Sequence, residues 1–148
     1  MLDIALKLLR MNPYGFLSTI GDDGRPHTRL VEHLAVEDDA TVWIGTSPAS
    51  RKVADVRRHP QVTYAVEDRG AFAYAAIEAQ AEVVDDLAER RAKWSTGHIA
   101  FFPDGPGGGD FVLLRLRPSR IELMDFTRQI HPEPYGLQPA LVELRERG

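Results

Sequence analysis

The chain has 148 residues, of which 43% are hydrophobic and 27% are charged, and it contains no cysteine. Its formal net charge of −4 argues against a nucleic-acid binder or a protein bound to anionic membranes, because both favour basic surfaces. The lack of cysteine excludes disulfides, thiolate nucleophiles and cysteine-ligated metals, and we expect a cytoplasmic protein. This length predicts a single domain over residues 1–148, and the charged residues within 1–13 predict neither a signal peptide nor a membrane anchor.

Apolar residues at helical spacing predict a short helix over residues 2–11, and Pro13 ends it because proline disfavours helical geometry in the residue before it. Two apolar stretches follow, at 15–20 and 26–36. The glycine-bounded segment 21–24 joins them, which predicts a β-hairpin.

Side chains alternate along a strand, so the second strand of the hairpin has two distinct faces. One face carries His27, Arg29, Val31 and His33. A third strand is predicted at 40–45, where β-branched and aromatic residues gather. Residues 49–59 then predict a short helix with Ser47 as N-cap and Pro48 in its first turn.

The next segments predict two more strands and a second surface helix. The strands cover 61–67 and 71–84, and the longer one has room for a bend. Residues 85–95 have helical composition, with Leu87 and Ala88 expected to face inward.

The last third of the chain predicts a loop, two strands and a tail. The loop is 98–109, and the strands are 111–116 and 120–126, with a turn at Pro118 and Ser119 between them. The tail is 128–148. It contains an apolar stretch at 137–144, which we expect to dock on a partner or to fray. Strands not separated by crossover helices cannot form a doubly wound parallel sheet. The sequence therefore predicts a mainly β protein, an antiparallel barrel of six or seven strands with flanking helices.

The segment 46–52 combines hydroxyl groups, two adjacent cations and the start of a helix. A helix N-terminus presents free N–H groups and a partial positive charge, and Arg51 and Lys52 add charged donors, so the segment outlines a phosphate site. The alternative is an ordinary surface helix whose Arg51 and Lys52 are solvated. Cations at the positive end of a helix are unfavourable alone and gain most when an anion neutralises them.

Arg29 is the second candidate, because it lies on the more polar face of its strand. Its guanidinium can bind a phosphate or a ring carbonyl through two donors. The alternative is a cross-strand ion pair with a carboxylate such as Glu67 or Glu82.

Together, Arg29-Leu30-Val31, Thr46 and Ser50-Arg51-Lys52 resemble the flavin-binding pattern of the pyridoxamine 5′-phosphate oxidase-like, FMN-binding split-barrel superfamily. The resemblance spans 15–126. Residues 77–82 resemble a strand of that family, and 94–116 are similar to its general-stress-protein branch.

The resemblance implies a split barrel that forms a homodimer with FMN at the subunit interface. It implies that Arg29 and the backbone around Leu30 and Val31 lie along the isoalloxazine ring and ribityl chain, that Thr46 and Ser47 contact the flavin, and that Ser50, Arg51 and Lys52 hold its phosphate. An aromatic residue of the second subunit would cover the ring, and Trp94 is the candidate.

The sequence departs from the family's pattern where the true oxidases bind their substrate. Leu34 replaces the lysine that binds the substrate phosphate, and Tyr74 replaces a flavin-contacting glutamine. A leucine cannot compensate the desolvation of a phosphate dianion. His131 does not restore the family's C-terminal Arg-x-His element, and Ala79 replaces a glycine. These departures argue against authentic pyridoxamine-phosphate oxidation.

The resemblance therefore predicts an FMN-dependent oxidoreductase for an unknown small molecule, with a reduced nicotinamide, NAD(P)H, as electron donor. The alternatives are a deazaflavin (F420)-dependent reductase, a non-catalytic flavin-binding or stress-related protein, and a haem-binding relative. No catalytic side chain is assigned, because hydride transfer needs none. No metal site is expected, because His27 and His33 lie about 20 Å apart at six strand rises.

Overall fold

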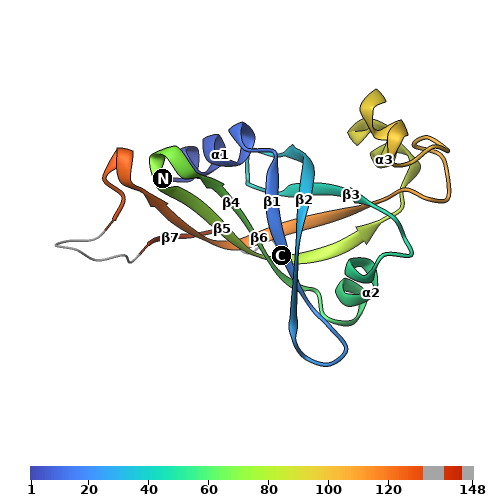
Figure 1. Cartoon of the computed structure of the whole chain (residues 1–148), viewed down its shortest axis with the longest axis horizontal. Coiled ribbons are helices and arrows are strands. Elements are labelled where there is room, and N and C mark those ends of the chain that lie inside the picture. The colour runs from blue at the N-terminus through green and yellow to red at the C-terminus, as the bar shows by residue number, and fades with distance from the viewer. Residues whose placement is uncertain (132–138, 145–148) are drawn as a thin grey trace.

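A computed structural model describes residues 1–131 and 139–144. Within them, six antiparallel strands close into a barrel, and one further strand and three α-helices lie outside it (Figure 1). The strands are β1 (Tyr14–Ile20), β2 (Pro26–Val36), β3 (Val42–Thr46), β4 (Gln61–Asp68), β5 (Ala73–Val84), β6 (Val112–Asp125) and β7 (Ala140–Glu143). The α-helices are α1 (Leu2–Met11), α2 (Arg51–Arg58) and α3 (Leu87–Lys93), and short 3-10 turns are η1 (Arg69–Ala71), η2 (Thr96–Ala100) and η3 (Phe126–Arg128).

The sheet closes because β3 pairs with both β2 and β6, so the order β3-β2-β1-β4-β5-β6 returns to its start. The predicted antiparallel barrel is confirmed. β7 pairs with β6 beyond the part that contacts β3, so the described part of the tail docks on this chain. Most of the predicted tail lies outside the described residues.

The β1–β2 hairpin has one face in the barrel and one in solvent. Leu17 lies opposite Arg29, and Phe16 lies opposite Leu30. Leu17 is fully buried, whereas Phe16 and Leu30 are 54% and 60% exposed. The alternation predicted for β2 is observed, and the face that carries Arg29 is directed toward the barrel while Leu30 points away.

The main core fills the barrel and extends to two helices. α1 contributes Leu8 and Leu9, and α2 contributes Val53 and Val56. Because α2 packs against β1 and β5, its first turn is fixed beside the hairpin. This packing positions the site described below.

One predicted turn is wrong: Pro118 and Ser119 do not reverse the chain. β6 continues as one strand, with Pro118 opposite Ala79 and Arg120 opposite Glu78, so that Ser119 forms a bulge. Its hydroxyl donates to the Glu78 carbonyl at 3.2 Å. Because β5 pairs along nearly the whole of β6, the strand bends here instead of turning back.

The inward face predicted for the helix at 85–95 is also wrong. Leu87 and Ala88 are exposed, and α3 buries none of its residues. Polar side chains make its contacts instead: Lys93 Nζ lies 4.4 Å from the centroid of the Trp43 ring, and Arg90 donates to the Phe111 carbonyl at 3.4 Å. A cation over an aromatic face thus replaces the expected apolar contact.

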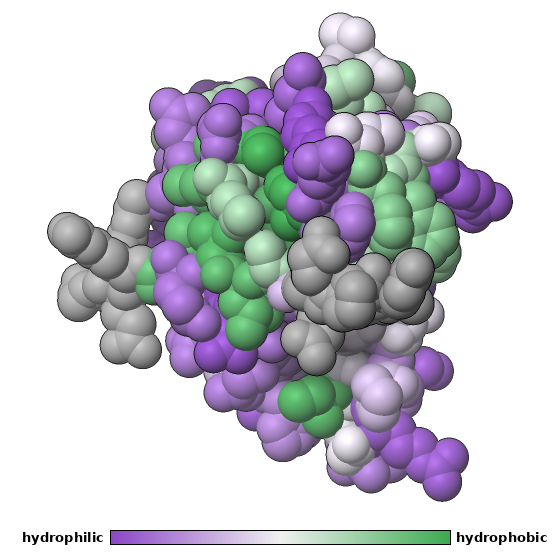
Figure 2. Space-filling view, turned by 90° about the vertical axis from the view of Figure 1, so that its left-hand side faces the viewer, coloured by the Kyte–Doolittle hydropathy of each residue, from purple (hydrophilic) through white to green (hydrophobic). Residues whose placement is uncertain are grey.

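The two ends of the molecule differ in character. η1, η3 and β7 lie at the end opposite α2 (Figure 1), and this end carries the exposed hydrophobic residues Phe72, Phe126 and Leu141. Figure 2 looks onto this end and shows a hydrophobic patch bordered by hydrophilic side chains. At the other end α2 exposes cations. Among the described residues, no helix is long and apolar enough to span a membrane.

Candidate functional site

A hydroxyl-rich turn connects β3 to α2. Thr46 is buried at the end of β3, and its Oγ1 donates to Ser50 Oγ at 3.2 Å. The Ala49 amide donates to Ser47 Oγ at 3.2 Å, and the Ser50 amide donates to the Ser47 carbonyl at 3.1 Å. Thr46, Ser47 and Ser50 are therefore brought together in one compact turn.

The helix starts two residues later than the sequence pattern predicts. Ser50, not Ser47, is the N-cap of α2, and Pro48 precedes the helix. The prediction was wrong because Ser47 and its neighbours make their own tight turn before the first helical residue. The Ser50 side chain makes no capping bond, so the first amides of α2 have no side-chain acceptor from their N-cap.

Three cations converge beside this turn: Arg29 from β2, and Arg51 and Lys52 from α2. Burial lowers the pKa of Lys52, and the charge of Arg29 lowers it further. Burial is also the largest cause of the lowered pKa of Arg29, to which the charge of Arg51 adds. In the described part of the chain, neither Arg51 nor Lys52 forms an ion pair. We call these three residues the cationic cradle; its unneutralised charge suits an anion such as a phosphate monoester.

Arg29 forms an ion pair, but not with either carboxylate considered from the sequence. Its Nη2 lies 3.8 Å from Oδ2 of Asp55 on α2. Glu67 instead pairs with Arg69, and Glu82 with Arg115. The alternative cross-strand pair does not form, because Arg29 points into the barrel, toward α2, rather than along the outer face of the sheet.

Asp55 is a site residue that sequence reasoning missed. It is 2% exposed and accepts a hydrogen bond of 2.8 Å from the hydroxyl of Thr19, which is buried on β1. The available signal was an acidic residue beside Val56, on the apolar face of a short helix. A carboxylate there must find partners inside the fold.

A cavity of about 400 Å³ adjoins the cradle and shares Arg51 with it. Its lining alternates carboxylates and cations from the hairpin turn and α2: Asp22, Asp23, His27, Arg51, Ala54, Asp55 and Arg58. The His27 ring lies over Gly21, where a Cβ would collide with it, so glycine permits this close packing.

The other predicted site residues lie apart from the cradle's charges. Leu30 points away from the barrel. Val31 lies on the other face of β2, which also carries Arg29, and packs against the core. Trp94 follows α3 and lies in a second hydrophobic cluster with Phe111 and Phe102, its ring centroid 5.0 Å from that of Phe111. In this chain Trp94 therefore contacts aromatic residues and not the cradle.

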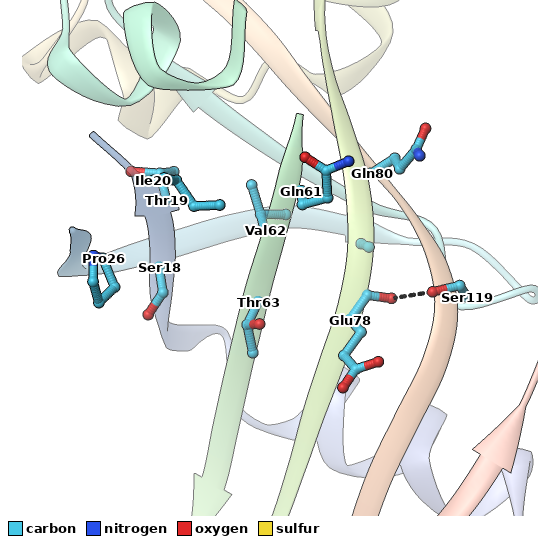
Figure 3. Close-up of a pocket in the computed structure, with 11 residues that line it drawn as sticks. Ser18, Thr19, Ile20, Pro26, Gln61, Val62, Thr63, Glu78, Gln80 and Ser119 are labelled. Carbon is cyan, nitrogen blue, oxygen red and sulfur yellow. Dashed lines mark hydrogen bonds between the residues drawn. The ribbon is translucent and has the colours of Figure 1, made fainter. Parts of the chain in front are cut away.

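A second groove of about 420 Å³ crosses the surface of β1, β4 and β5. Figure 3 shows Ser18, Thr63 and Glu78 on three neighbouring strands, with Ser119 bonded to the Glu78 carbonyl. Hydroxyl, amide and carboxylate groups line it, and no cation does. Of these two depressions, only the one beside the cradle is lined by arginines, Arg51 and Arg58, and three carboxylates accompany them.

Comparisons with known proteins bear on the family and on the fold. The family described as pyridoxamine 5′-phosphate oxidase matches residues 2–125. A protein related to general stress protein 26, of the pyridoxinephosphate oxidase family, from Clostridium acetobutylicum superimposes with a TM-score of 0.81 at 17% identity, covering 96% of this chain and 93% of that one. General stress protein 26 from Bacillus anthracis gives a TM-score of 0.78 at 19% identity, with coverage of 97% and 98%. Curated proteins give no match.

Two further structures with the same fold carry different cofactors in their names. An F420 reductase has a TM-score of 0.61 at 21% identity, covering 78% of this chain and 93% of that one. A heme binding protein from Mycobacterium smegmatis has a TM-score of 0.71 at 18% identity, covering 96% of this chain and 57% of that one. At these identities the likeness establishes the fold.

Proposed function

The chain belongs to the pyridoxamine 5′-phosphate oxidase family, and from this premise we propose that it is a homodimeric, FMN-dependent oxidoreductase acting on a small organic molecule. A reduced nicotinamide supplies the electrons. The cationic cradle carries the proposal: it gathers three positive charges, two of them without an ion pair in the described residues, beside the first turn of α2.

The residues of the cradle fit the phosphate end of FMN. Arg29 and Arg51 provide forked donors, and Lys52 provides a compact charge on a half-buried side chain. Ser50 and the first amides of α2 add neutral donors at the positive end of the helix dipole. Thr46 orients the Ser50 hydroxyl by donating to it. The chain thus supplies affinity and orientation at one end of the cofactor.

The bound flavin would supply the redox chemistry through its isoalloxazine ring. Arg29, Arg51 and Lys52 would hold the phosphate end of the cofactor, and this would orient the rest of the molecule. No proton donor or acceptor of this chain is required for the hydride transfer itself.

The substrate is not pyridoxamine phosphate. Leu34 lies where the true oxidases have a substrate-binding lysine, and it packs against the cluster of Trp43 and Phe111. Tyr74, at the position of a flavin-contacting glutamine, directs its hydroxyl to Glu122 at 3.4 Å. Neither arrangement offers a cation to a second phosphate.

The outer face of the hairpin is the proposed dimer surface. Tyr14, Phe16 and Leu30 lie on it and are 58%, 54% and 60% exposed. Phe16 and Leu30 are cross-strand partners, so their side chains form one apolar patch. An isologous dimer buries such a patch against its own copy.

Purification and spectroscopy test this function. The purified protein should carry an absorption band of bound flavin, and mass spectrometry should identify FMN. Lys52→Glu should abolish flavin retention while the circular dichroism spectrum is unchanged. Arg57→Glu is the matched control, since it makes the same charge reversal at an exposed position of the same helix. Equal loss of flavin in both variants would contradict a specific role of the cradle.

The F420 reductase with the same fold supports a second candidate, a deazaflavin-dependent reductase. The cradle would accept the phosphate of either cofactor, so reconstitution with FMN and with F420, each followed by a binding titration, separates the two. A flavin carrier without turnover is the third candidate, in line with the general stress proteins. Stopped-flow reduction by NADH or NADPH decides it, because a carrier reacts no faster than free FMN.

A further inference from the structure

Asp55 places a buried negative charge beneath a site that gathers positive charge. Three side chains approach the same oxygen, Oδ2: the Thr19 hydroxyl at 2.8 Å, Nδ1 of His27 at 3.4 Å and Nη2 of Arg29 at 3.8 Å. By Coulomb's law alone, a carboxylate this close to the cradle repels a bound phosphate. Its presence therefore needs a reason other than charge attraction to the ligand.

The hydrogen bonds around Arg29 supply that reason. Arg29 Nη1 donates to Thr19 Oγ1 at 2.7 Å and to the Leu17 carbonyl at 3.3 Å. A hydroxyl has one proton, and Thr19 gives it to Asp55, which as a carboxylate can only accept. The lone pairs of Thr19 are thus left to receive Arg29. Asp55 holds the guanidinium both directly and through this relay.

We propose that Asp55 is a positioning residue of the cradle, which fixes Arg29 through Thr19 in the orientation that binds the cofactor's phosphate. The inference rests on the proposed function, because it assumes that the cradle binds a phosphate. The orientation of the Arg29 guanidinium is then set by α2, the helix that also carries Arg51 and Lys52. One rigid element then controls all three cations.

The proposal and simple electrostatics predict opposite signs. Asp55→Asn removes a negative charge at nearly constant shape, so electrostatics alone predicts tighter phosphate binding. The amide of asparagine can also donate to Thr19, which turns the hydroxyl proton toward Arg29 and breaks the relay. The positioning role therefore predicts weaker binding although the site becomes more positive.

The experiment titrates flavin-free protein with FMN and with riboflavin, which lacks the phosphate, and follows flavin fluorescence. For Asp55→Asn we expect the affinity for FMN to fall about tenfold, the loss of one hydrogen bond to a charged group, with the affinity for riboflavin unchanged. Unchanged or tighter FMN binding by a folded Asp55→Asn protein overturns the proposal.

A second pair of variants leaves the carboxylate in place. Thr19→Val removes the relay and should reproduce the loss of FMN affinity, whereas Thr19→Ser keeps the hydroxyl and should restore it. This pair decides the question if Asp55→Asn does not fold, and equal FMN affinity of the two variants overturns the proposal. The wild-type protein and Lys52→Ala test separately whether the cradle binds a phosphate. If neither protein binds FMN more tightly than riboflavin, the proposed function is wrong, and the role of Asp55 is not what failed.

Discussion

At the scale of single residues, His33 and Tyr64 form a buried, hydrogen-bonded pair inside the barrel. Nε2 of His33 lies 2.8 Å from the Leu9 carbonyl, which can only accept, so Nε2 carries the proton. Nδ1 then accepts the Tyr64 hydroxyl at 2.6 Å. Gly15 makes room for that hydroxyl, because a Cβ there would lie 2.6 Å from the Tyr64 ring. The pair ties the end of α1 to the inside of the barrel.

Removing the Tyr64 hydroxyl should destabilise the fold. Tyr64→Phe leaves Nδ1 of His33 buried without a donor, which costs about 1–3 kcal/mol in the free energy of unfolding. Urea denaturation measures the change. Tyr14→Phe deletes the same group at an exposed position and should have little effect. An equal effect of the two substitutions would show that the buried bond contributes nothing.

The same pair predicts a dependence of stability on pH. Burial lowers the pKa of His33 below its ordinary 6.5, although the Leu9 carbonyl and the charge of Glu32 oppose the shift. The unfolded chain therefore binds a proton more readily than the folded one, and stability falls as the pH drops below about 6.5 toward the folded pKa. Above that window the contribution is complete. In His33→Gln, urea midpoints measured from pH 8 to 5 should lose this part of the slope; an unchanged slope contradicts the assignment.

At the scale of elements, α3 shows how polar side chains dock a helix that buries no residue. Lys93 Nζ lies over the Trp43 ring and 3.1 Å from Glu89 Oε2, and Arg90 donates to the Gly108 carbonyl at 3.0 Å. The aliphatic stem of a lysine covers apolar surface while its charge faces an aromatic ring. The helix therefore depends on a few contacts rather than on an apolar stripe.

We expect Lys93→Ala to loosen α3 without unfolding the barrel. A cation over an aromatic ring contributes about 0.5–2 kcal/mol, so amide hydrogen exchange in α3 should accelerate by roughly twofold to thirtyfold, while exchange in β4 and β5 is unchanged. Arg91→Ala is the matched control, because Arg91 is exposed on the same helix. If both variants exchange alike, the contact with Trp43 does not hold the helix.

At the scale of the whole molecule, the barrel sorts charge and hydrophobicity onto different surfaces. α2 and its cations lie at one end, and the exposed residues Phe72 and Phe126 lie at the other (Figure 1). Between them, the hairpin exposes the apolar patch of Tyr14, Phe16 and Leu30. Arg29 of the cradle lies on the inner face of the same hairpin. A second subunit bound to the outer face would therefore be separated from the proposed phosphate site by the thickness of one sheet.

Phe16→Glu should convert the proposed dimer to a monomer. A carboxylate in the centre of the apolar patch would be desolvated against its own copy in the partner, and like charges would repel. Size-exclusion chromatography with light scattering measures the mass. Phe101→Glu is the control, because Phe101 is 75% exposed and lies in the segment after α3. A wild-type monomer, or a Phe16→Glu dimer, contradicts this surface.

The sequence by itself determined the features that local chemistry governs. The spacing of apolar residues, glycines and prolines predicted α1 and the β1–β2 hairpin, which the structure confirms. The contiguous run from Thr46 to Lys52 predicts an anion site, because its hydroxyls, cations and helix start are neighbours along the chain. Its residues also carried the family resemblance, which the family match confirms.

Only the tertiary structure decided which distant groups meet. Asp55 contacts Thr19 across 36 residues, and Arg29 turns to α2 rather than to a neighbouring strand. Ser119 forms a bulge and not a turn, because β5 pairs with the residues of β6 on both sides of it. Long-range contacts of this kind depend on barrel closure and helix docking. Local propensity carries no information about such contacts, since the partners are set by the whole packing arrangement.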